Sequence, residues 1–327
     1  MTLKSKRVLV TGAGGFIGSH LSEKLVETGA SVRALVHYNS AGSWGWLDDS
    51  PLKDEMEIVA GDVTDRDSVR RAMQDVDIVF HLAALIAIPY SYQAPTSYLR
   101  TNAEGTLNVL QAALEAGIER VLHTSTSEVY GTAQYVPIDE RHPLQGQSPY
   151  SATKIAADQL AEAFHRSYGL PVTIVRPFNT FGPRQSARAV IPTIIVQALS
   201  CDRIKLGHLA PTRDFNFVRD TVAGFLSLAQ SPGVIGEVVN IGSGREISIG
   251  DLAHHILKVL GKDLPIEEDA ARVRPEKSEV DRLLADNSKA GKLTGWKPQY
   301  SLEEGLQVTA EWIAQHLDRY RSDVYTI

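Results

Sequence analysis

Short apolar runs alternate with helically spaced apolar residues along the first half of this chain. The runs are rich in β-branched and aliphatic residues and predict strands at 7–11, 31–36, 56–60, 77–81, 120–124 and 172–176. Helices are predicted between them, for example over 65–75 and from about 95 to 116, where Leu99, Leu107, Leu110 and Leu114 recur at helical intervals. Strands that alternate with helices predict an α/β fold, a doubly wound parallel sheet with helices on both faces.

The pattern changes beyond Gly182, where loops become richer in arginine and proline. Short strands are predicted at 204–206 and 238–241, with a helix from about 248 to 260 and another opened by the capping box at Ser301 and Glu304. Because 327 residues exceed the usual size of a single core, two lobes are expected. We predict a dinucleotide-binding Rossmann domain of residues 1–180 with roughly 218–245. A smaller substrate-binding lobe would comprise roughly 181–217 and 246–327.

The first strand leads directly into a glycine cluster, and helical spacing starts at once after it. The glycines follow the pattern Gly12-x-x-Gly15-x-x-Gly18. A strand, a glycine turn and a helix let the backbone approach a pyrophosphate, which the N–H groups and the positive dipole end of the helix then bind. This arrangement predicts a dinucleotide site at Gly12, Gly15, Phe16, Ile17 and Gly18.

The end of the second strand leaves the choice between NAD and NADP open. An acidic residue there binds the adenosine ribose in NAD-specific proteins, but this chain continues His37-Tyr38-Asn39-Ser40 and has no acid before Asp48. We predict NAD(P)+ as the cofactor, with NAD+ slightly favoured. Since ligands of such sheets bind outside the carboxyl ends of the strands, further cofactor contacts are expected there. They are His37, Asn39, Ser40, Asp62, Val63, Leu82, Ala83, Ala84 and Pro177.

Composition excludes several classes of partner. The net charge of −6 provides no basic surplus for nucleic acid or an anionic membrane. The single cysteine, Cys201, cannot form an internal disulfide and suits a reducing compartment. No apolar run approaches the roughly 18 residues of a membrane span, and no signal peptide precedes the first strand. With no metal-ligand spacing present, we expect a cytoplasmic enzyme that binds no metal, nucleic acid or membrane.

Tyr150 and Lys154 are the first candidates for chemistry. Pro149 suits the first turn of a helix, and the i,i+4 spacing places the phenol and the ammonium on one face. A free tyrosine has a pKa of about 10, too high for a base at neutral pH. A neighbouring ammonium and an oxidised nicotinamide both favour the phenolate, so Tyr150 can remove a hydroxyl proton while a hydride leaves the same carbon.

Together these motifs resemble the extended short-chain dehydrogenases/reductases that act on nucleotide sugars. The resemblance rests on the glycine turn at 11–18, Thr126, the Tyr150–Lys154 pair, and the segments 213–220 and 295–298. It implies that Arg213 contacts the sugar-nucleotide pyrophosphate, and that a homodimer forms through helices beginning near Asn102 and Tyr150. The expected substrate contacts are Tyr90, Asn179, Arg188, Arg213 and Arg274.

Residues 125–131 discriminate between members of that family. They include Thr126-Ser127-Glu128, a form similar to GDP-mannose 4,6-dehydratases, whereas 4-epimerases usually have a small or neutral residue in place of Glu128. Segments 37–40 and 44–47 look most like N-acetylglucosamine-nucleotide 4,6-dehydratases of the legionaminic-acid type, and segment 274–281 also resembles GDP-mannose dehydratases. Two alternatives stay open within the fold, because UDP-glucuronate decarboxylases also carry Thr-Ser-Glu and 4-epimerases share the first step. A non-catalytic NAD(P)-binding sensor is a third.

The resemblance implies a sequence of steps on a nucleotide hexose. Tyr150, aided by Thr126 and Lys154, removes the C4 hydroxyl proton as hydride goes to the cofactor. The C4 ketone acidifies the C5 hydrogen, Glu128 removes it, and water leaves C6. Hydride then returns to C6 and yields a 4-keto-6-deoxy sugar. Ser127 stands where many relatives have aspartate, which leaves protonated Glu128 as a candidate acid for the departing water.

Overall fold

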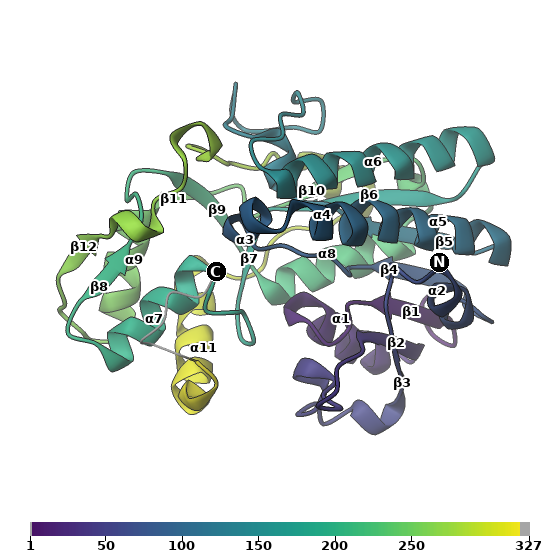
Figure 1. The fold of residues 1–327 in the computed structure, drawn as a ribbon, viewed down its shortest axis with the longest axis horizontal. Coiled ribbons are helices and arrows are strands. Elements are labelled where there is room, and N and C mark those ends of the chain that lie inside the picture. The colour runs from purple at the N-terminus through teal and green to yellow at the C-terminus, as the bar shows by residue number, and fades with distance from the viewer. Residues whose placement is uncertain (1, 321–327) are drawn as a thin grey trace.

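A seven-stranded parallel sheet is the centre of the computed structural model, which describes residues 2–320 (Figure 1). The strand order is β10-β6-β5-β4-β1-β2-β3, with every neighbouring pair parallel. The strands are β1 (Arg7–Thr11), β2 (Ser31–His37), β3 (Met56–Gly61), β4 (Ile78–His81), β5 (Arg120–Thr124), β6 (Val172–Pro177) and β10 (Val238–Ile241). The predicted doubly wound α/β fold is therefore confirmed.

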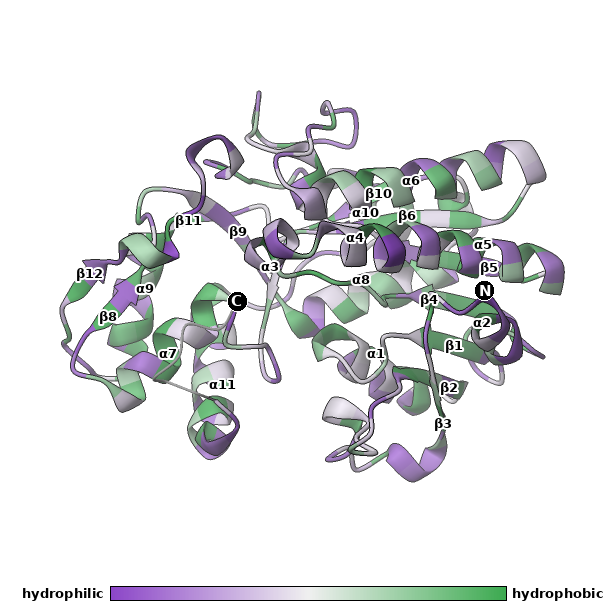
Figure 2. Cartoon of the chain, viewed as in Figure 1, coloured by the Kyte–Doolittle hydropathy of each residue, from purple (hydrophilic) through white to green (hydrophobic). Residues whose placement is uncertain are grey.

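Helices cover both faces of this sheet, and the strands between them are mostly hydrophobic (Figure 2). One face is covered by α1 (Phe16–Glu27) and α8 (Val218–Gln230), the other by α2 (Arg66–Ala72), α5 (Gly105–Ala116) and α6 (Pro149–Tyr168). Strands buried on both sides need continuous apolar runs, which is why the sequence pattern was readable. None of the helices within residues 2–320 is long and apolar enough to cross a membrane.

Two predicted helices differ from expectation. Helix α2 is shorter than 65–75, because Asp65 is its N-cap, accepting from the N–H of Asp67 and Ser68, and Asp75 has a φ of +57°. The predicted helix over 95–116 is interrupted. It consists of α4 (Pro95–Tyr98), a π-helical segment over Leu99–Glu104, and α5.

The π-helical segment has a tertiary cause. The Asn102 side chain accepts from the Leu85 N–H at 2.8 Å and donates to the Leu85 carbonyl at 2.9 Å and to the Thr153 hydroxyl at 3.1 Å. These bonds connect the loop after β4 to α6. The wider turn rotates the preceding residues, so Leu99 is 55% exposed while Leu110 is 1% exposed, although the regular pattern placed them on one face.

The smaller lobe, on the left in Figure 1, contains two short sheets and three principal helices. One sheet joins β7 (Asn179–Phe181), β9 (Thr212–Phe217) and β11 (Glu246–Ser248), and the other joins β8 (Ile204–Leu206) and β12 (Ile266–Glu268). The helices are α7 (Val190–Ser200), α9 (Ile249–Val259) and α11 (Leu302–Gln315). The predicted capping box at Ser301 and Glu304 is present. Strand β10, by contrast, pairs with β6 and extends the large sheet, and α10 (Ser288–Thr294) packs against it.

The loop after β2 contacts the last helices of the chain. Its Trp46 N–H donates to the Gly14 carbonyl at 2.9 Å, which fixes the loop on the glycine turn. The Trp46 ring meets the Trp312 ring edge-on, with centroids 5.2 Å apart. Arg319 forms an ion pair with Asp49 at 2.7 Å, so the sheet domain and α11 are connected on this side of the molecule.

Candidate active site

The glycine turn after β1 packs closely against itself and against the loop after β4. Gly12 has a φ of +71°, and a Cβ on it would meet the Ala83 nitrogen at 2.8 Å, while a Cβ on Gly18 would collide with the Gly12 carbonyl. The Thr11 hydroxyl accepts from the N–H of Leu82 and of Ala83, both at 3.1 Å. These bonds hold the loop after β4 beside the turn. The resulting cradle of glycines and helix N-terminus fits the pyrophosphate of a dinucleotide.

The other predicted cofactor residues near this turn also lie at the carboxyl edge of the sheet. Gly15 is the N-cap of α1, with extended backbone, and Phe16 and Ile17 are the first two residues of the helix. Ala84 is in the loop after β4, and Pro177 is the last residue of β6. The structure thus gathers them in one place, and their contacts with a cofactor stay predictions.

The ends of β2 and β3 form the neighbouring part of this edge. His37 Nδ1 lies 3.9 Å from the Asp62 carboxylate, which supplies an acidic group that residues 37–40 lack. The Asn39 side chain is occupied in its own loop, where it bonds the backbone of residues 41 and 43. The contact between Asn39 and a cofactor stays a prediction. Ser40 is exposed, and Val63 is buried.

Lys154 lies on the buried face of α6, at the end of β5. Its Nζ donates to the Thr124 carbonyl at 2.7 Å, and the side chain is almost completely buried. Burial lowers the pKa of Lys154 to about 8, although the negative charge of Asp158 opposes this shift. The ammonium is thus held at a fixed point, one helical turn from Tyr150.

Tyr150 is buried in the first turn of α6. Its ring packs edge-on against Tyr98, with centroids 6.2 Å apart. Burial raises the pKa of the Tyr150 phenol, a hydrogen bond with Thr126 lowers it, and the charge of Glu128 raises it. The predicted partners Thr126 and Glu128 therefore both act on the pKa of this hydroxyl. The phenol is protonated at neutral pH, and a positive charge placed beside it would favour the phenolate.

Glu128 lies on a short 3₁₀ turn after β5. Thr126 is the N-cap of a 3₁₀ turn over Ser127–Tyr130, and its hydroxyl accepts from the Glu128 N–H at 3.2 Å. Glu128 is half-buried, and its charge acts on the pKa of both Tyr150 and Arg213. Ser127 is buried at 2% exposure. The turn thus carries a carboxylate whose charge acts on both the phenol and Arg213.

A buried polar cluster supports α6 beneath these groups. Asp158, one turn beyond Lys154, accepts from the Ser125 hydroxyl at 2.8 Å and lies 3.3 Å from His123 Nε2. Burial raises the pKa of Asp158, but His123 and Arg176 outweigh it, so the pKa falls below its usual value. Asp158 is consequently charged at neutral pH.

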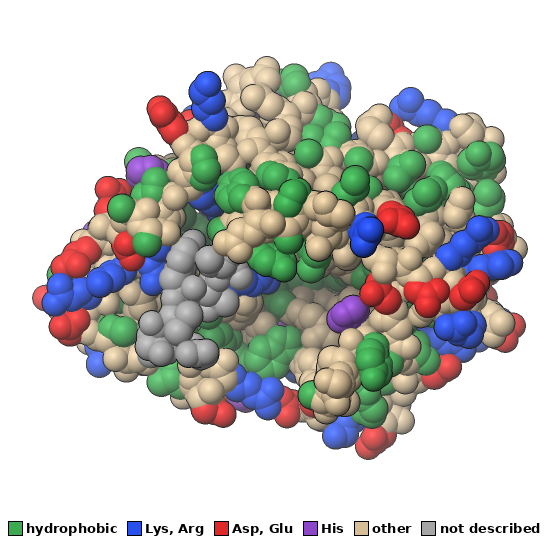
Figure 3. Space-filling view, in the orientation of Figure 1, with side chains coloured by type: hydrophobic (Ala, Val, Ile, Leu, Met, Phe, Trp, Pro, Cys, Tyr) green, Lys and Arg blue, Asp and Glu red, His purple; other side chains and the backbone are tan. Residues whose placement is uncertain are grey.

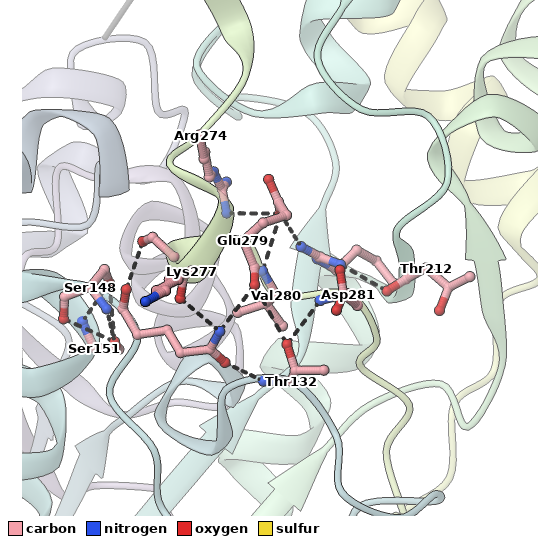
Figure 4. Close-up of polar contacts among 12 residues, drawn as sticks. Thr132, Ser148, Ser151, Thr212, Arg274, Lys277, Glu279, Val280 and Asp281 are labelled. Carbon is pink, nitrogen blue, oxygen red and sulfur yellow. Dashed lines mark hydrogen bonds and ion pairs between the residues drawn. The ribbon is translucent and has the colours of Figure 1, made fainter.

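Arg213 and Arg274 come together around one carboxylate (Figure 4). Glu279 Oε1 lies 3.2 Å from Nη2 of Arg213 and 3.6 Å from Nη1 of Arg274. Arg213 is 6% exposed, and Nη1 of Arg274 is buried without a hydrogen-bond partner within the described residues. Two convergent guanidinium groups, one with an unused donor, fit a ligand that carries two phosphates.

The remaining predicted substrate contacts are Arg188, Tyr90 and Asn179. Burial lowers the pKa of Arg188, and the charges of Tyr98 and Tyr150 oppose that shift. The Tyr90 ring lies 6.2 Å from the Tyr98 ring. Asn179 begins β7, and its side-chain oxygen is buried without a hydrogen-bond partner among the described residues. Such an orphaned acceptor is available to a ligand hydroxyl.

Sequence reasoning did not single out Tyr98, Asp158 or Glu279. Asp158 had a usable signal, since it continues the i,i+4 series from Tyr150 and Lys154. Tyr98 and Glu279 had none, because their roles depend on contacts with residues far away in the chain. The space-filling view shows a hollow between the sheet domain and the smaller lobe (Figure 3). Within residues 2–320, no three His, Cys, Asp or Glu side chains are arranged to hold a metal ion.

The match to a known family decides what kind of protein this is. The family model described as GDP-mannose 4,6 dehydratase covers residues 9–309. The chain belongs to this family. Its members are NAD-dependent nucleotide-sugar dehydratases and epimerases of the extended short-chain dehydrogenase/reductase fold, so the resemblance drawn from the motifs is confirmed.

Individual relatives of the family match over nearly their whole length. The low-salt glycan biosynthesis protein Agl12 of Haloferax volcanii is 34% identical over 310 residues, covering 93% of this chain and 97% of that protein. The epimerase Mth375 of Methanothermobacter thermautotrophicus has a TM-score of 0.89 at 32% identity, covering 98% and 96%. DesIV of Streptomyces venezuelae, a dTDP-glucose 4,6-dehydratase solved with NAD bound, has a TM-score of 0.87 at 32% identity, covering 96% and 99%.

Proposed function

We propose that the protein is a nucleotide-sugar 4,6-dehydratase, acting on UDP- or GDP-N-acetylglucosamine. The observation that carries this proposal is the place of Glu128, whose charge acts on both the Tyr150 phenol and Arg213. A 4-epimerase needs the phenol but no carboxylate beside C5. A dehydratase needs both, because elimination requires a base for the C5 hydrogen.

Each residue then has a defined task in that reaction. NAD+, which the glycine cradle fits and which DesIV carries, supplies the hydride acceptor when bound. Tyr150 takes the C4 hydroxyl proton, and the Lys154 ammonium stabilises the resulting phenolate. Thr126 hydrogen-bonds the phenol and orients it. Glu128 then removes the C5 proton and, once protonated, can give it to the departing C6 hydroxyl.

A second set of residues binds the substrate. Arg213 and Arg274 bind the diphosphate, and Asn179 accepts a hydrogen bond from the sugar through its orphaned oxygen. Arg188 and Tyr90 line the sugar end of the pocket beside Tyr98. Ser127 offers a hydroxyl, a much weaker acid than a carboxyl group, which leaves protonated Glu128 to protonate the leaving group.

Product analysis tests the proposal directly. Purified protein is incubated with UDP- and GDP-N-acetylglucosamine, and the masses of the products are measured by mass spectrometry. We expect the loss of one water, and no loss with Tyr150→Phe, which keeps the ring packed against Tyr98. If no nucleotide hexose loses water, the proposal is wrong. Any dinucleotide bound to the purified protein is released with acid and identified. Its identity shows whether the protein holds NAD+ or NADP+.

A 4-epimerase is the second candidate, because Mth375 is described as an epimerase and has the same fold over 98% of this chain. In that case, the same incubation gives a product of unchanged mass whose C4 configuration is inverted, visible by NMR. Release of carbon dioxide from UDP-glucuronate would instead indicate a decarboxylase.

A further inference from the structure

The charge balance around Arg213 and Arg274 depends on one side chain. Glu279 Oε1 lies within 3.6 Å of both guanidinium groups, and its side chain is 15% exposed (Figure 4). Burial lowers the pKa of Arg213, and the negative charges of Glu128 and Glu279 oppose that shift. A buried guanidinium without a counter-ion is costly, so Glu279 supplies the anion that this pair needs in the free protein.

The position of the Glu279 carboxylate between the two arginines becomes unfavourable once a diphosphate binds there. A carboxylate and a phosphate present similar oxygens to a guanidinium, so both compete for the same donors of Arg213 and Arg274. They also repel one another, because like charges brought together in a partly buried site cost free energy. Glu279 and the diphosphate therefore compete for the arginine pair.

The backbone of Glu279 is held separately from its side chain, whose Oε1 also accepts from the Val280 N–H at 3.3 Å. Its carbonyl accepts from Gln147 Nε2 at 3.0 Å and from the Thr132 hydroxyl at 3.5 Å. The preceding Ser278 donates to the Gln147 carbonyl at 2.6 Å. These contacts connect the segment to the residue before Ser148, the N-cap of the helix that carries Tyr150. Release of the arginines is thus a rotation of the Glu279 side chain, with no shift of α6.

We propose that Glu279 is a specificity-determining residue, a resident counter-ion that only a diphosphate displaces. A ligand with two adjacent anionic phosphates replaces the carboxylate on both arginines at once. A monophosphate replaces the carboxylate on one arginine and leaves the carboxylate beside the other arginine. The inference rests on the proposed function insofar as the natural ligand is a nucleotide sugar.

Binding measurements with product-like nucleotides test this role without any turnover. Dissociation constants for UDP, UMP, GDP and GMP are measured by calorimetry on wild type and Glu279→Gln. We expect Glu279→Gln to bind the preferred diphosphate about tenfold more tightly, since one repulsive charge is removed. The monophosphate gains more, so the ratio between the two affinities shrinks.

The control is Glu276→Gln, which removes an equal charge from an exposed side chain three residues away. It should leave all four constants within twofold of wild type. Glu279→Asp is a second variant, in which a shorter carboxylate spans the two arginines less well, and we expect an intermediate affinity. Thermal melting of each variant shows that it is folded.

The outcomes separate this inference from the proposed function. Unchanged or weaker diphosphate binding by folded Glu279→Gln and Glu279→Asp would mean that Glu279 only orders the arginines, and the inference would be overturned. Failure of the wild type to bind either UDP or GDP would instead contradict the proposed substrates. An equal gain by Glu276→Gln would show a general charge effect and also overturn the inference.

Discussion

The Asp158 carboxylate accepts hydrogen bonds from both Nε and Nη2 of Arg176, at 3.1 and 2.9 Å, with both side chains buried. Arg176 in turn donates to the Tyr130 hydroxyl at 3.0 Å. The pair connects α6 to β6 directly beneath Lys154. The helix that carries Tyr150 and Lys154 is therefore fixed to the sheet by buried charge as well as by apolar packing.

Removing one partner of this pair should destabilise the protein strongly. Asp158→Asn leaves the Arg176 charge buried and unpaired, so we expect the free energy of unfolding to fall by about 3–5 kcal/mol. Urea unfolding followed by circular dichroism measures it. Glu162→Gln on the same helix breaks the Arg166–Glu162 pair at the surface and should cost less than about 1 kcal/mol. Equal effects of the two variants would contradict this account.

Lys154 should give the stability of the ligand-free protein a specific pH dependence. Its pKa is about 8 in the folded protein, against an ordinary value of 10.5. Between these values the unfolded chain binds more protons, so stability rises with pH there, whereas below pH 8 the buried charge is a constant cost. The stability advantage of Lys154→Met over wild type should shrink by roughly 3 kcal/mol from pH 8 to 10.5, at about 1.4 kcal/mol per pKa unit. A pH-independent difference would show that Lys154 has an unshifted pKa.

Glu128→Gln should separate oxidation from elimination. A general base typically contributes about 10²–10⁴-fold, so we expect dehydration to slow by that factor. Oxidation at C4 depends on Tyr150, so the variant should still reduce its cofactor in a single turnover, seen by absorbance, and accumulate a 4-keto hexose. Near-normal dehydration by the folded variant would mean that Glu128 has only a structural role in its loop.

Gly12→Ala should weaken dinucleotide binding beyond its effect on the backbone. Gly12 and Gly169 both have a φ of +71°, but a Cβ on Gly169 meets nothing within 4 Å. Gly169→Ala therefore reports the cost of that conformation alone. We expect both variants to lose stability, and only Gly12→Ala to lose retained cofactor, measured by its release on denaturation. Equal retention would argue against the cradle.

A homodimer is expected from the helices near Asn102 and Tyr150. Leu99 on the π-helical segment and Leu114 on α5 are exposed, and apolar side chains of this kind gain from burial against a second copy. Light scattering at micromolar concentration should give twice the chain mass. A monomer would contradict the expectation, and Leu99→Glu should weaken the dimer if this surface forms the contact.

Local pattern was sufficient for the sheet and the glycine turn. Strands such as 120–124 and 172–176 are buried on both faces. Such strands need continuous apolar runs, which can be recognised in the sequence without knowledge of their neighbours. The Tyr150–Lys154 pair was readable for a similar reason, since i,i+4 spacing fixes their common face within a single helix.

Contacts between distant segments were not readable. Glu279 meets Arg213 across 66 residues of chain, and nothing local to either residue signals the pairing. The Asn39 side chain is held by its own loop, and Glu128 lies on a 3₁₀ turn whose N-cap is Thr126. In each case the backbone between the motif and its partners decided the geometry, and its conformation depends on the whole fold.

The π-helical segment at 99–104 makes the site sensitive to chain length at that point. An α-helix turns by about 100° per residue. Deleting one residue from the wide turn would therefore restore an ordinary helix and rotate the residues before the deletion relative to those after it. Asn102 would then no longer face both Leu85 and Thr153, although no reacting group had changed. A one-residue deletion there should misplace the loop after β4 against α6, whereas substitutions on the exposed side of the segment keep that geometry.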